Sequence, residues 1–366
     1  MSDMTQSSTS PNTNQFAAAV IESGLDALAA YATTELLEAR PHLIEMFGHG
    51  ARASWQQNLA ARLEELCAAL TVRRPELFAH DLAWTKASFH LRELDLEDLR
   101  ESNRALLRVI DQELPRKVYA EVKPYFELAE EELRGDTVRV IEHLDAETPH
   151  GKLAARYLLA ILEGNRREAS ELVLNAVRDG LAVRDAYLEV LIPASREVGR
   201  MWHAGELNIA EEHFATATTE LVMCRLHAFF PEVERHRRTV ICAAAQGNLH
   251  GLAVRVISDF FEMDGWRVIH LGANMPARDL AQAAVDFKAD LLAISITMSR
   301  HLRNTTEIVR QVRESLPERK VPILVGGLAM TVADDLWHEL GADASATTAT
   351  EAVRVGRRLV GLSAAD

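Results

Sequence analysis

The apolar residues of this chain follow two different spacings. From Gln15 to about Leu144 they recur every three or four positions, as in "LDALAAYATTELLEA" and "WQQNLAARLEELCAAL". That spacing is typical of amphipathic helices, and prolines at positions 41, 75, 115 and 124 punctuate it. We expect an all-α domain of five or six helices over residues 15–147. Residues 1–14, rich in Ser, Thr and Asn, are expected to form a disordered tail.

A second helical region covers residues 148–235. Thr148 and Pro149 form a helix start, with a capping hydroxyl and a proline at the first helical position. Four apolar-periodic segments follow, each ended by Gly or Pro, which predicts a four-helix bundle. Gly205 is expected to end the third helix, while Asn208 with Glu211 forms a capping box for the fourth.

The spacing changes over residues 236–366. The short β-branched runs "TVICAA", "WRVIHL", "DLLAISIT" and "VPILVGG" alternate with helical stretches, and "DASAT" provides a fifth run. Apolar strands alternating with helices predict a doubly wound parallel sheet. Ligands of such folds bind outside the carboxyl ends of the strands, so the loops after the first, third and fourth strands are the candidate site.

Composition restricts the possible partners. The 366 residues carry a net charge of −14, and a basic face supplies most of the affinity for nucleic-acid phosphates, so we expect no direct nucleic-acid binding. The three cysteines form no CxxC pair, which is typical of a reducing compartment. We find neither a signal peptide nor an apolar run long enough to cross a membrane, and expect a cytoplasmic protein.

Polar and small residues gather at the predicted strand ends. A histidine after a strand is usually a surface or capping residue, and a Gly-Gly pair is usually a turn. Here they occur together and in order: Asn248, His250 and Gly251; then Ser295 and Thr297; then Gly326 and Gly327. This set resembles the cobalamin-binding domain family, with its Asp-x-His-x-x-Gly, Ser-x-Leu/Thr and Gly-Gly motifs.

The resemblance implies a role for each of these residues. His250 would ligate cobalt from below, a role that suits imidazole, while Ser295, Thr297, Gly326 and Gly327 would admit the nucleotide tail of the cofactor. Two positions depart from the pattern: Asn248 replaces the acidic residue, and Ala253 replaces the terminal Gly. An Asn carbonyl can orient the imidazole but cannot take up a proton, which argues against a protein that cycles its cobalt through methyl transfer.

The stretch "GRMWHAGELNIAEEHF" lies in the predicted bundle and holds Trp202, His203, Glu212 and His213. The plain alternative is a core Trp beside a solvated Glu-His pair. With the downstream motif, Trp-x9-Glu-His resembles the bundle of adenosylcobalamin-dependent light sensors, such as repressors of carotenoid genes. The resemblance implies that Trp202 and Glu212 accommodate the 5′-deoxyadenosyl group and that His203 takes the upper cobalt position after photolysis.

The all-α domain of residues 15–147 looks globin-like, and its fusion to a cobalamin photosensor resembles the photocobilins, which pair cobalamin with a bilin such as biliverdin. The alternatives are ordinary packing, or haem on His80 or His90; a thioether to Cys67 is not expected. A bilin needs aromatic walls and partners for its propionates. The candidate bilin-binding residues are Trp55, His80, Trp84, Phe89, His90 and Arg92.

Together these motifs predict a photoreceptor, a binding protein rather than an enzyme, whose domain arrangement changes when light breaks the cobalt–carbon bond. The first alternative is a corrinoid carrier in methyl transfer. The second is a dark cobalamin sensor whose helical domain binds another protein. We expect a homodimer, as for a signalling module. We also expect a separate, unidentified protein partner, because the sequence shows no kinase, cyclase or DNA-reading domain.

Overall fold

The computed structural model describes residues 13–135, 143–145 and 147–363. The chain divides into two compact units, Met1–Val138 and Arg139–Asp366, and the predicted bundle and sheet fall into the same one. The predicted tail lies outside the described residues except at its end, since the first helix begins at Thr13. In the described part of the chain, no helix is both long and apolar enough to cross a membrane.

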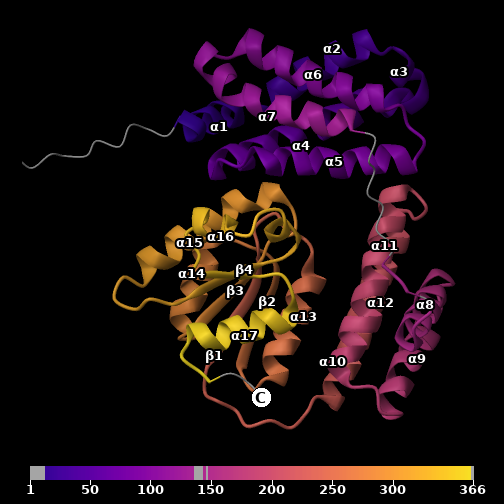
Figure 1. Cartoon of the computed structure of the whole chain (residues 1–366), viewed down its shortest axis with the longest axis vertical. Coiled ribbons are helices and arrows are strands. Elements are labelled where there is room, and N and C mark those ends of the chain that lie inside the picture. Colours follow the sequence, from indigo (N-terminus) through magenta and orange to yellow (C-terminus); the bar gives the residue numbers. More distant parts are fainter. Residues whose placement is uncertain (1–12, 136–142, 146, 364–366) are drawn as a thin grey trace, which may run out of the picture. The chain divides into compact units, whose positions relative to one another are not determined.

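The first unit is helical throughout its described part (Figure 1). Seven α-helices occur there, one of them a short segment between longer helices. Pro75 and Pro115 lie at helix starts, as the sequence pattern predicts, but Pro124 lies inside a helix. The elements are α1 (Thr13–Ser23), α2 (Leu25–Ala39), α3 (His42–Phe47), η1 (Gly48–Gly50), α4 (Ala51–Val72), α5 (Pro75–Leu91), α6 (Leu96–Glu113) and α7 (Arg116–Arg134).

Apolar side chains of these helices form the core of the first unit. Leu36, Leu63 and Phe78 are fully buried, and the rings of Phe78 and Phe126 lie 5.1 Å apart. Cys67 is buried, as a small apolar side chain would be. The unit is therefore all-α, and its globin-like packing stays a prediction.

The second unit begins with the predicted bundle. Thr148 Oγ1 accepts a hydrogen bond from Gly151 N at 3.0 Å and caps the first helix. The third helix contains a π-helical segment, η2, a local distortion frequent at functional sites. The bundle elements are α8 (Pro149–Leu162), α9 (Arg166–Arg178), α10 (Val183–Asp185), η2 (Ala186–Leu191), α11 (Ile192–Ala204), α12 (Ile209–Leu226) and η3 (His227–Phe229).

A five-stranded sheet follows, in the order β2-β1-β3-β4-β5, and every pairing is parallel. Strands β1 and β3 are buried along their whole length, as their continuous apolar runs predict. The strands are β1 (Thr239–Ala245), β2 (Arg267–Met275), β3 (Leu291–Ser295), β4 (Ile323–Gly326) and β5 (Ala344–Ala346). The predicted parallel α/β fold is confirmed.

Helices cover both faces of the sheet (Figure 1). Helix α13 (Gly251–Met263) and α17 (Ala349–Leu359) pack together on one face, while α14 (Ala277–Asp286) and α15 (Leu302–Ser315) pack together on the other. The short segments η4 (Ser299–His301), η5 (Leu328–Thr331) and α16 (Leu336–Glu339) complete the unit. The carboxyl ends of β1, β3 and β4 consequently open at one edge.

Hydrogen bonds to α13 join the bundle to the sheet and its helices. Tyr187 of η2 donates a hydrogen bond to Oδ2 of Asp259 at 2.7 Å, and Arg255 Nε donates to the same carboxylate at 2.8 and 2.9 Å. Burial raises the pKa of Asp259, although the hydrogen bonds from Tyr187 and Arg255 act in the opposite direction. Because α13 starts directly after His250, one helix joins the candidate ligand loop to the bundle.

Candidate functional site

The loop after β1 places Asn248 and His250 in direct contact. Asn248 is fully buried, and its Nδ2 donates to the main-chain carbonyl of Ser295 at 3.0 Å. This bond orients the amide so that Oδ1 faces His250, where it accepts from the main-chain N–H at 3.2 Å. Imidazole Nδ1 lies 2.8 Å from the same oxygen. An amide oxygen only accepts, so Nδ1 carries the proton and Nε2 keeps its lone pair.

The surroundings of His250 favour the neutral ring. Burial lowers its pKa, the nearby Arg300 lowers it further, and Glu212 raises it. A neutral imidazole with its lone pair at Nε2 is the form that binds a metal. The amide of Asn248 thus performs the orienting part of the role that a carboxylate performs in histidine–metal sites.

Ser295 and Thr297 lie where β3 ends, beside this loop. Ser295 is 8% exposed, and in the part of the chain that the structure describes its buried Oγ has no hydrogen-bond partner. A buried hydroxyl without a partner is costly, which fits a site completed by a polar ligand. Thr297 is partly exposed.

Gly326 and Gly327 bring the end of β4 against its neighbours. A Cβ on Gly326 would lie 2.7 Å from the carbonyl oxygen of Ala346, and one on Gly327 would lie 2.4 Å from that of Ile296. Gly327 also has a φ of 104°, a left-handed value that side chains disfavour. The Gly-Gly pair is therefore required by the backbone itself, beyond the ligand-admitting role that the resemblance implies.

The bundle residues Trp202, His203, Glu212 and His213 lie around the turn between α11 and α12. Gly205 adopts a left-handed conformation with a φ of 78° and ends α11. The capping box of Asn208 and Glu211 is present at the start of α12. Trp202 is 39% exposed and His203 is 7% exposed, so these successive side chains point in different directions.

Glu212 is held by its own helix. One carboxylate oxygen lies 2.6 Å from Nδ1 of His213, and the other accepts from Thr216 Oγ1 at 2.8 Å. His213 is exposed. The charge of Glu212 raises the pKa of His250. The two halves of the predicted site therefore lie within electrostatic reach of each other.

Comparison with known proteins agrees with this geometry. Residues 238–355 match the B12 binding domain family, and residues 153–226 match a second B12 binding domain family. This part of the chain is a cobalamin-binding module. The first match covers the sheet and its helices, and the second covers the bundle, so the two predicted halves of the site correspond to the two families.

The relatives fall into two groups. The chain is 30% identical to the HTH-type transcriptional repressor CarH of Myxococcus xanthus over 186 residues, which are 50% of this chain and 60% of the repressor. It is 25% identical to dimethylamine corrinoid protein 3 of Methanosarcina acetivorans over 215 residues, 55% of this chain and all of that protein. This chain thus spans less than two thirds of the repressor.

A solved structure shares the fold of the cobalamin-binding module. The monomethylamine corrinoid protein of Methanosarcina barkeri aligns with a TM-score of 0.51 at 21% identity, covering 57% of this chain and 98% of that one. At this identity the likeness shows the fold alone. The expectation that this chain does not bind nucleic acid stays a prediction, since CarH is named a transcriptional repressor.

The residues of the cobalamin-binding module fit the cofactor on observations of their own. His250 offers a neutral Nε2, Ser295 offers a buried hydroxyl without a partner among the described residues, and the Gly-Gly turn leaves no side chain at the end of β4. His250 would hold the cobalt, and Ser295 and Gly326 would line the space for the nucleotide tail. Bound cobalamin would supply a cobalt centre with an exchangeable upper ligand.

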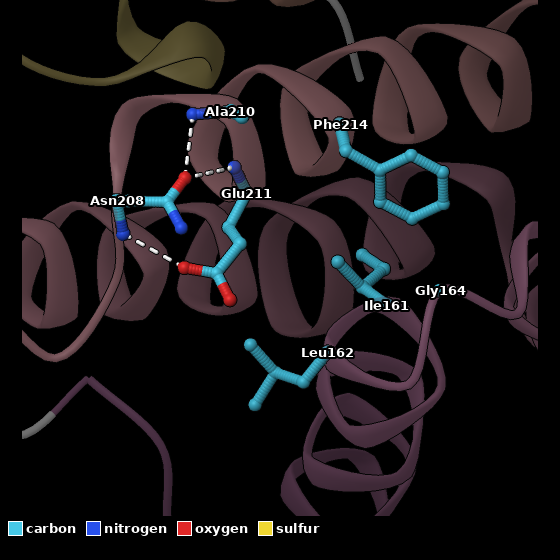
Figure 2. A pocket seen from close by; sticks show the side chains of 7 residues that line it. All are labelled: Ile161, Leu162, Gly164, Asn208, Ala210, Glu211 and Phe214. Carbon is cyan, nitrogen blue, oxygen red and sulfur yellow. Dashed lines mark hydrogen bonds between the residues drawn. The ribbon is translucent and has the colours of Figure 1, made fainter.

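Figure 2 shows a pocket elsewhere in the bundle, with a volume of about 260 Å³. It lies between the end of α8 and the start of α12, and Asn208 and Glu211 at its rim are engaged in the capping box. None of the predicted cobalamin residues lines it. The lining residues are Ile161, Leu162, Gly164, Asn208, Ala210, Glu211 and Phe214.

The candidate bilin residues of the first unit are not all alike. Trp55 of α4 is 8% exposed and packs edge-on against Phe47, with ring centroids 6.3 Å apart. Phe89 is partly exposed, and the other four candidates are exposed on α5 or just after it: His80, Trp84, His90 and Arg92. No comparison supports a bilin, which stays a prediction.

Three residues near the ligand loop were not predicted from the sequence. Asn274 at the end of β2 accepts from Gly247 N at 2.8 Å. Asn304 of α15 donates to the carbonyl of Gln246 at 2.7 Å. His301 is 2% exposed, and burial, Arg300 and His250 together lower its pKa to about 4. No spacing rule marks these positions, because they reach the loop from β2, η4 and α15, three elements well separated from it along the chain.

Proposed function

We propose that this chain is a light sensor that binds adenosylcobalamin. The observation that carries the proposal is the placement of Glu212 in the first turn of α12, where His213 and Thr216 hold its carboxylate, next to the helix α11 that carries Trp202. Trp202 lies in the last turn of α11. This arrangement matches the Trp-x9-Glu-His motif of adenosylcobalamin-dependent light sensors, and the similarity to the repressor CarH supports it.

Adenosylcobalamin supplies a cobalt–carbon bond that light breaks. In the proposed sensor, His250 would hold the cobalt, and Trp202 and Glu212 would contact the adenosyl group. Without that group, Trp202 and Glu212 would have no ligand to contact, and the bundle would repack against the sheet. Helix α13 transmits the change, because it joins the loop of His250 to Tyr187 of the bundle through Asp259.

The experiment is reconstitution with adenosylcobalamin in the dark, followed by green light. Free adenosylcobalamin also responds to light, so the readout is the protein: its hydrogen exchange over α11 and α12 and its size by scattering. We expect both to change on illumination. In Trp202→Ala the change should be reduced, and in the control Leu159→Ala, which alters an exposed residue of α8, it should persist. A protein that stays the same in dark and light would refute the proposal.

A corrinoid carrier in methyl transfer is the second candidate. It is favoured by the match to the full length of a dimethylamine corrinoid protein and disfavoured by Asn248, which cannot take up a proton. The two candidates differ in ligand preference. A sensor should bind adenosylcobalamin at least tenfold more tightly than methylcobalamin, and Trp202→Ala should remove the difference. Equal affinities in the unaltered protein would favour the carrier.

The second chromophore is a separate proposal. If the first unit binds a bilin, co-expression with a source of biliverdin should add red-absorbing bands to the spectrum of the purified protein. Trp55→Ala should remove those bands without affecting the cobalamin spectrum. A spectrum without red bands would rule the bilin out while leaving the cobalamin proposal intact.

A further inference from the structure

The end of strand β2 is unusual in its backbone. Cys242 of β1 pairs with His270 of β2, and Ala245 pairs with Met275. An advance of three residues along β1 therefore corresponds to an advance of five residues along β2. Two extra residues are thus inserted into β2 in this stretch. Both Gly272 and Asn274 within it have left-handed backbones, with φ of 77° and 57°. Insertions of this kind bend a strand and re-aim its side chains, and they are common beside functional sites.

Asn274 forms hydrogen bonds with two successive residues, Gly247 and Asn248, of the loop that carries His250. Its Oδ1 accepts from Gly247 N at 2.8 Å, and its main-chain N–H donates to the carbonyl of Asn248 at 3.0 Å. Asn248 is the residue that orients the imidazole of His250. A left-handed backbone is unusual for a residue other than glycine, and here it allows both bonds at once.

Other bonds complete the support of the loop. Asn304 holds the carbonyl of Gln246 from α15 at 2.7 Å, and Ser295 holds the side chain of Asn248 from β3 at 3.0 Å. The loop is therefore hydrogen-bonded to three elements, β2, β3 and α15. Asn274 forms its bonds through both its main chain and its side chain. A metal-ligating side chain depends on such outer contacts for its orientation.

We propose that Asn274 is a positioning residue for His250, which holds the loop in the conformation that presents Nε2 to a cobalt ion. The proposal rests on the proposed cobalamin site. Asn274 acts through Gly247 and Asn248, to which it is hydrogen-bonded. Without its side chain, the loop samples other conformations, and the imidazole spends less time in the ligating position.

The test uses two variants and one control on the full chain. Asn274→Gly keeps the left-handed backbone and the main-chain bond but removes the side-chain acceptor. Asn274→Asp keeps an acceptor in the same place. Lys288→Gly changes another non-glycine residue with a left-handed backbone, φ 53°, in the turn after α14, and controls for the effect of added glycine.

The first readout needs no cofactor. In the apoprotein, hydrogen exchange of the Gly247 amide should speed up at least tenfold in Asn274→Gly and stay near the native rate in Asn274→Asp and Lys288→Gly. The second readout is electron paramagnetic resonance of the Co(II) cobalamin complex with ¹⁵N-labelled histidine, in which splitting by ¹⁵N reports histidine on the metal. We expect that signal to fall in Asn274→Gly, with cobalamin affinity lowered about tenfold.

The outcomes separate the two proposals. If the exchange rate of the Gly247 amide stayed unchanged in Asn274→Gly, the inference would be overturned. It would also be overturned if that exchange became faster while the ¹⁵N splitting stayed undiminished, because Asn274 would then stabilise the loop without positioning His250. Asn274→Asp behaving like Asn274→Gly would exclude the acceptor as the cause. A native complex without any ¹⁵N splitting would show that His250 does not bind cobalt, and would refute the lower-ligand role together with the inference built on it.

Discussion

Imidazole Nδ1 of His250 lies 2.8 Å from Oδ1 of Asn248, and the amide cannot be turned without breaking its bond to Ser295. The pair settles which ring nitrogen holds the proton and which one faces away with a lone pair. A carboxylate at position 248 would fix the same tautomer but would also strengthen the imidazole as a donor and exchange protons with it. Asn248 orients the imidazole as a carboxylate would, but it cannot exchange protons with the ring.

Replacing Asn248 should separate these two effects. In Asn248→Ala the ring loses its orienting acceptor, and we expect cobalamin affinity to fall by about 10- to 100-fold. In Asn248→Asp the acceptor returns with an ionisable group, so the fraction of histidine-ligated cobalamin should become pH-dependent, rising with pH as the carboxyl group ionises. Visible spectra across a pH series measure that fraction.

The control for this series is Asn58→Ala, which removes an exposed side chain bonded to the carbonyl of Ser54 in its own helix. It should bind cobalamin as the native protein does. If Asn248→Ala bound cobalamin with native affinity, the orienting role of the amide would be wrong.

The sequence predicts the motif residues and helix caps of this site, but it does not predict all the contacts that hold them in place. The strand-helix alternation predicts the parallel sheet, and the run Asn248–His250 falls at the end of β1 because the apolar pattern ends there. The capping box at Asn208 is a local rule and is present as predicted. Asn274 could not be predicted, because its role depends on two insertions in β2 whose presence is set by pairing with β1.

The π-helical segment shows the same limit. The sequence predicts one continuous helix through Tyr187 and Trp202, and the structure divides it into α10, η2 and α11. The distortion accompanies the contact of Tyr187 with Asp259 on α13, a residue far along the chain. Helical periodicity is a local signal, so tertiary contacts of this kind lie beyond it.

His301 should make the apoprotein less stable in acid. Burial and the neighbouring Arg300 and His250 lower its pKa to about 4, against an ordinary value near 6.5. Between these values the unfolded chain binds a proton that the folded chain excludes, so the free energy of unfolding falls as pH drops from about 6.5 to about 4. The largest contribution is about 3 kcal/mol. Urea unfolding of the apoprotein across this range measures it.

In His301→Asn, which keeps an acceptor for the N–H of Met298, the dependence on pH should be flatter over the same interval. The exposed His49, changed to Asn in the same way, should leave the native slope in place. Equal slopes in His301→Asn and the native protein would show that His301 titrates normally.

Gly327 should tolerate no side chain. Gly327→Ala combines a left-handed backbone with a Cβ 2.4 Å from the carbonyl oxygen of Ile296, so the ends of β3 and β4 must separate. We expect a loss of about 3 kcal/mol or more of unfolding free energy and loss of cobalamin binding. Gly180→Ala is the matched control, since Gly180 has a similar φ of 110° and, apart from its chain neighbours, no described residue comes within 4 Å of the position that its Cβ would take.

The control should cost about 1 kcal/mol from the backbone alone and leave binding intact. Denaturant unfolding and cobalamin titration of the two variants together separate the backbone effect from the clash. Similar losses in both variants would mean that the approach of β4 to β3 is looser than the structure shows.

Tyr187 should couple the bundle to the sheet. Tyr187→Phe removes the hydrogen bond to Asp259, which keeps its two bonds from Arg255, so the loss should be about 1 kcal/mol. Tyr157→Phe removes a comparable buried bond, to Thr219, but inside the bundle. Both variants should lose similar stability, yet only Tyr187→Phe should speed hydrogen exchange in α13. It should also weaken the effect of a bound cobalamin on exchange in η2 and α11, because the path from His250 along α13 to the bundle passes through Asp259.

A similar change of exchange in α13 in both variants would contradict this prediction. The contact between Tyr187 and Asp259 would then be one packing interaction among many. The coupling would have to run through the apolar contacts of α13, such as that between the rings of Phe260 and Tyr187, whose centroids lie 6.0 Å apart.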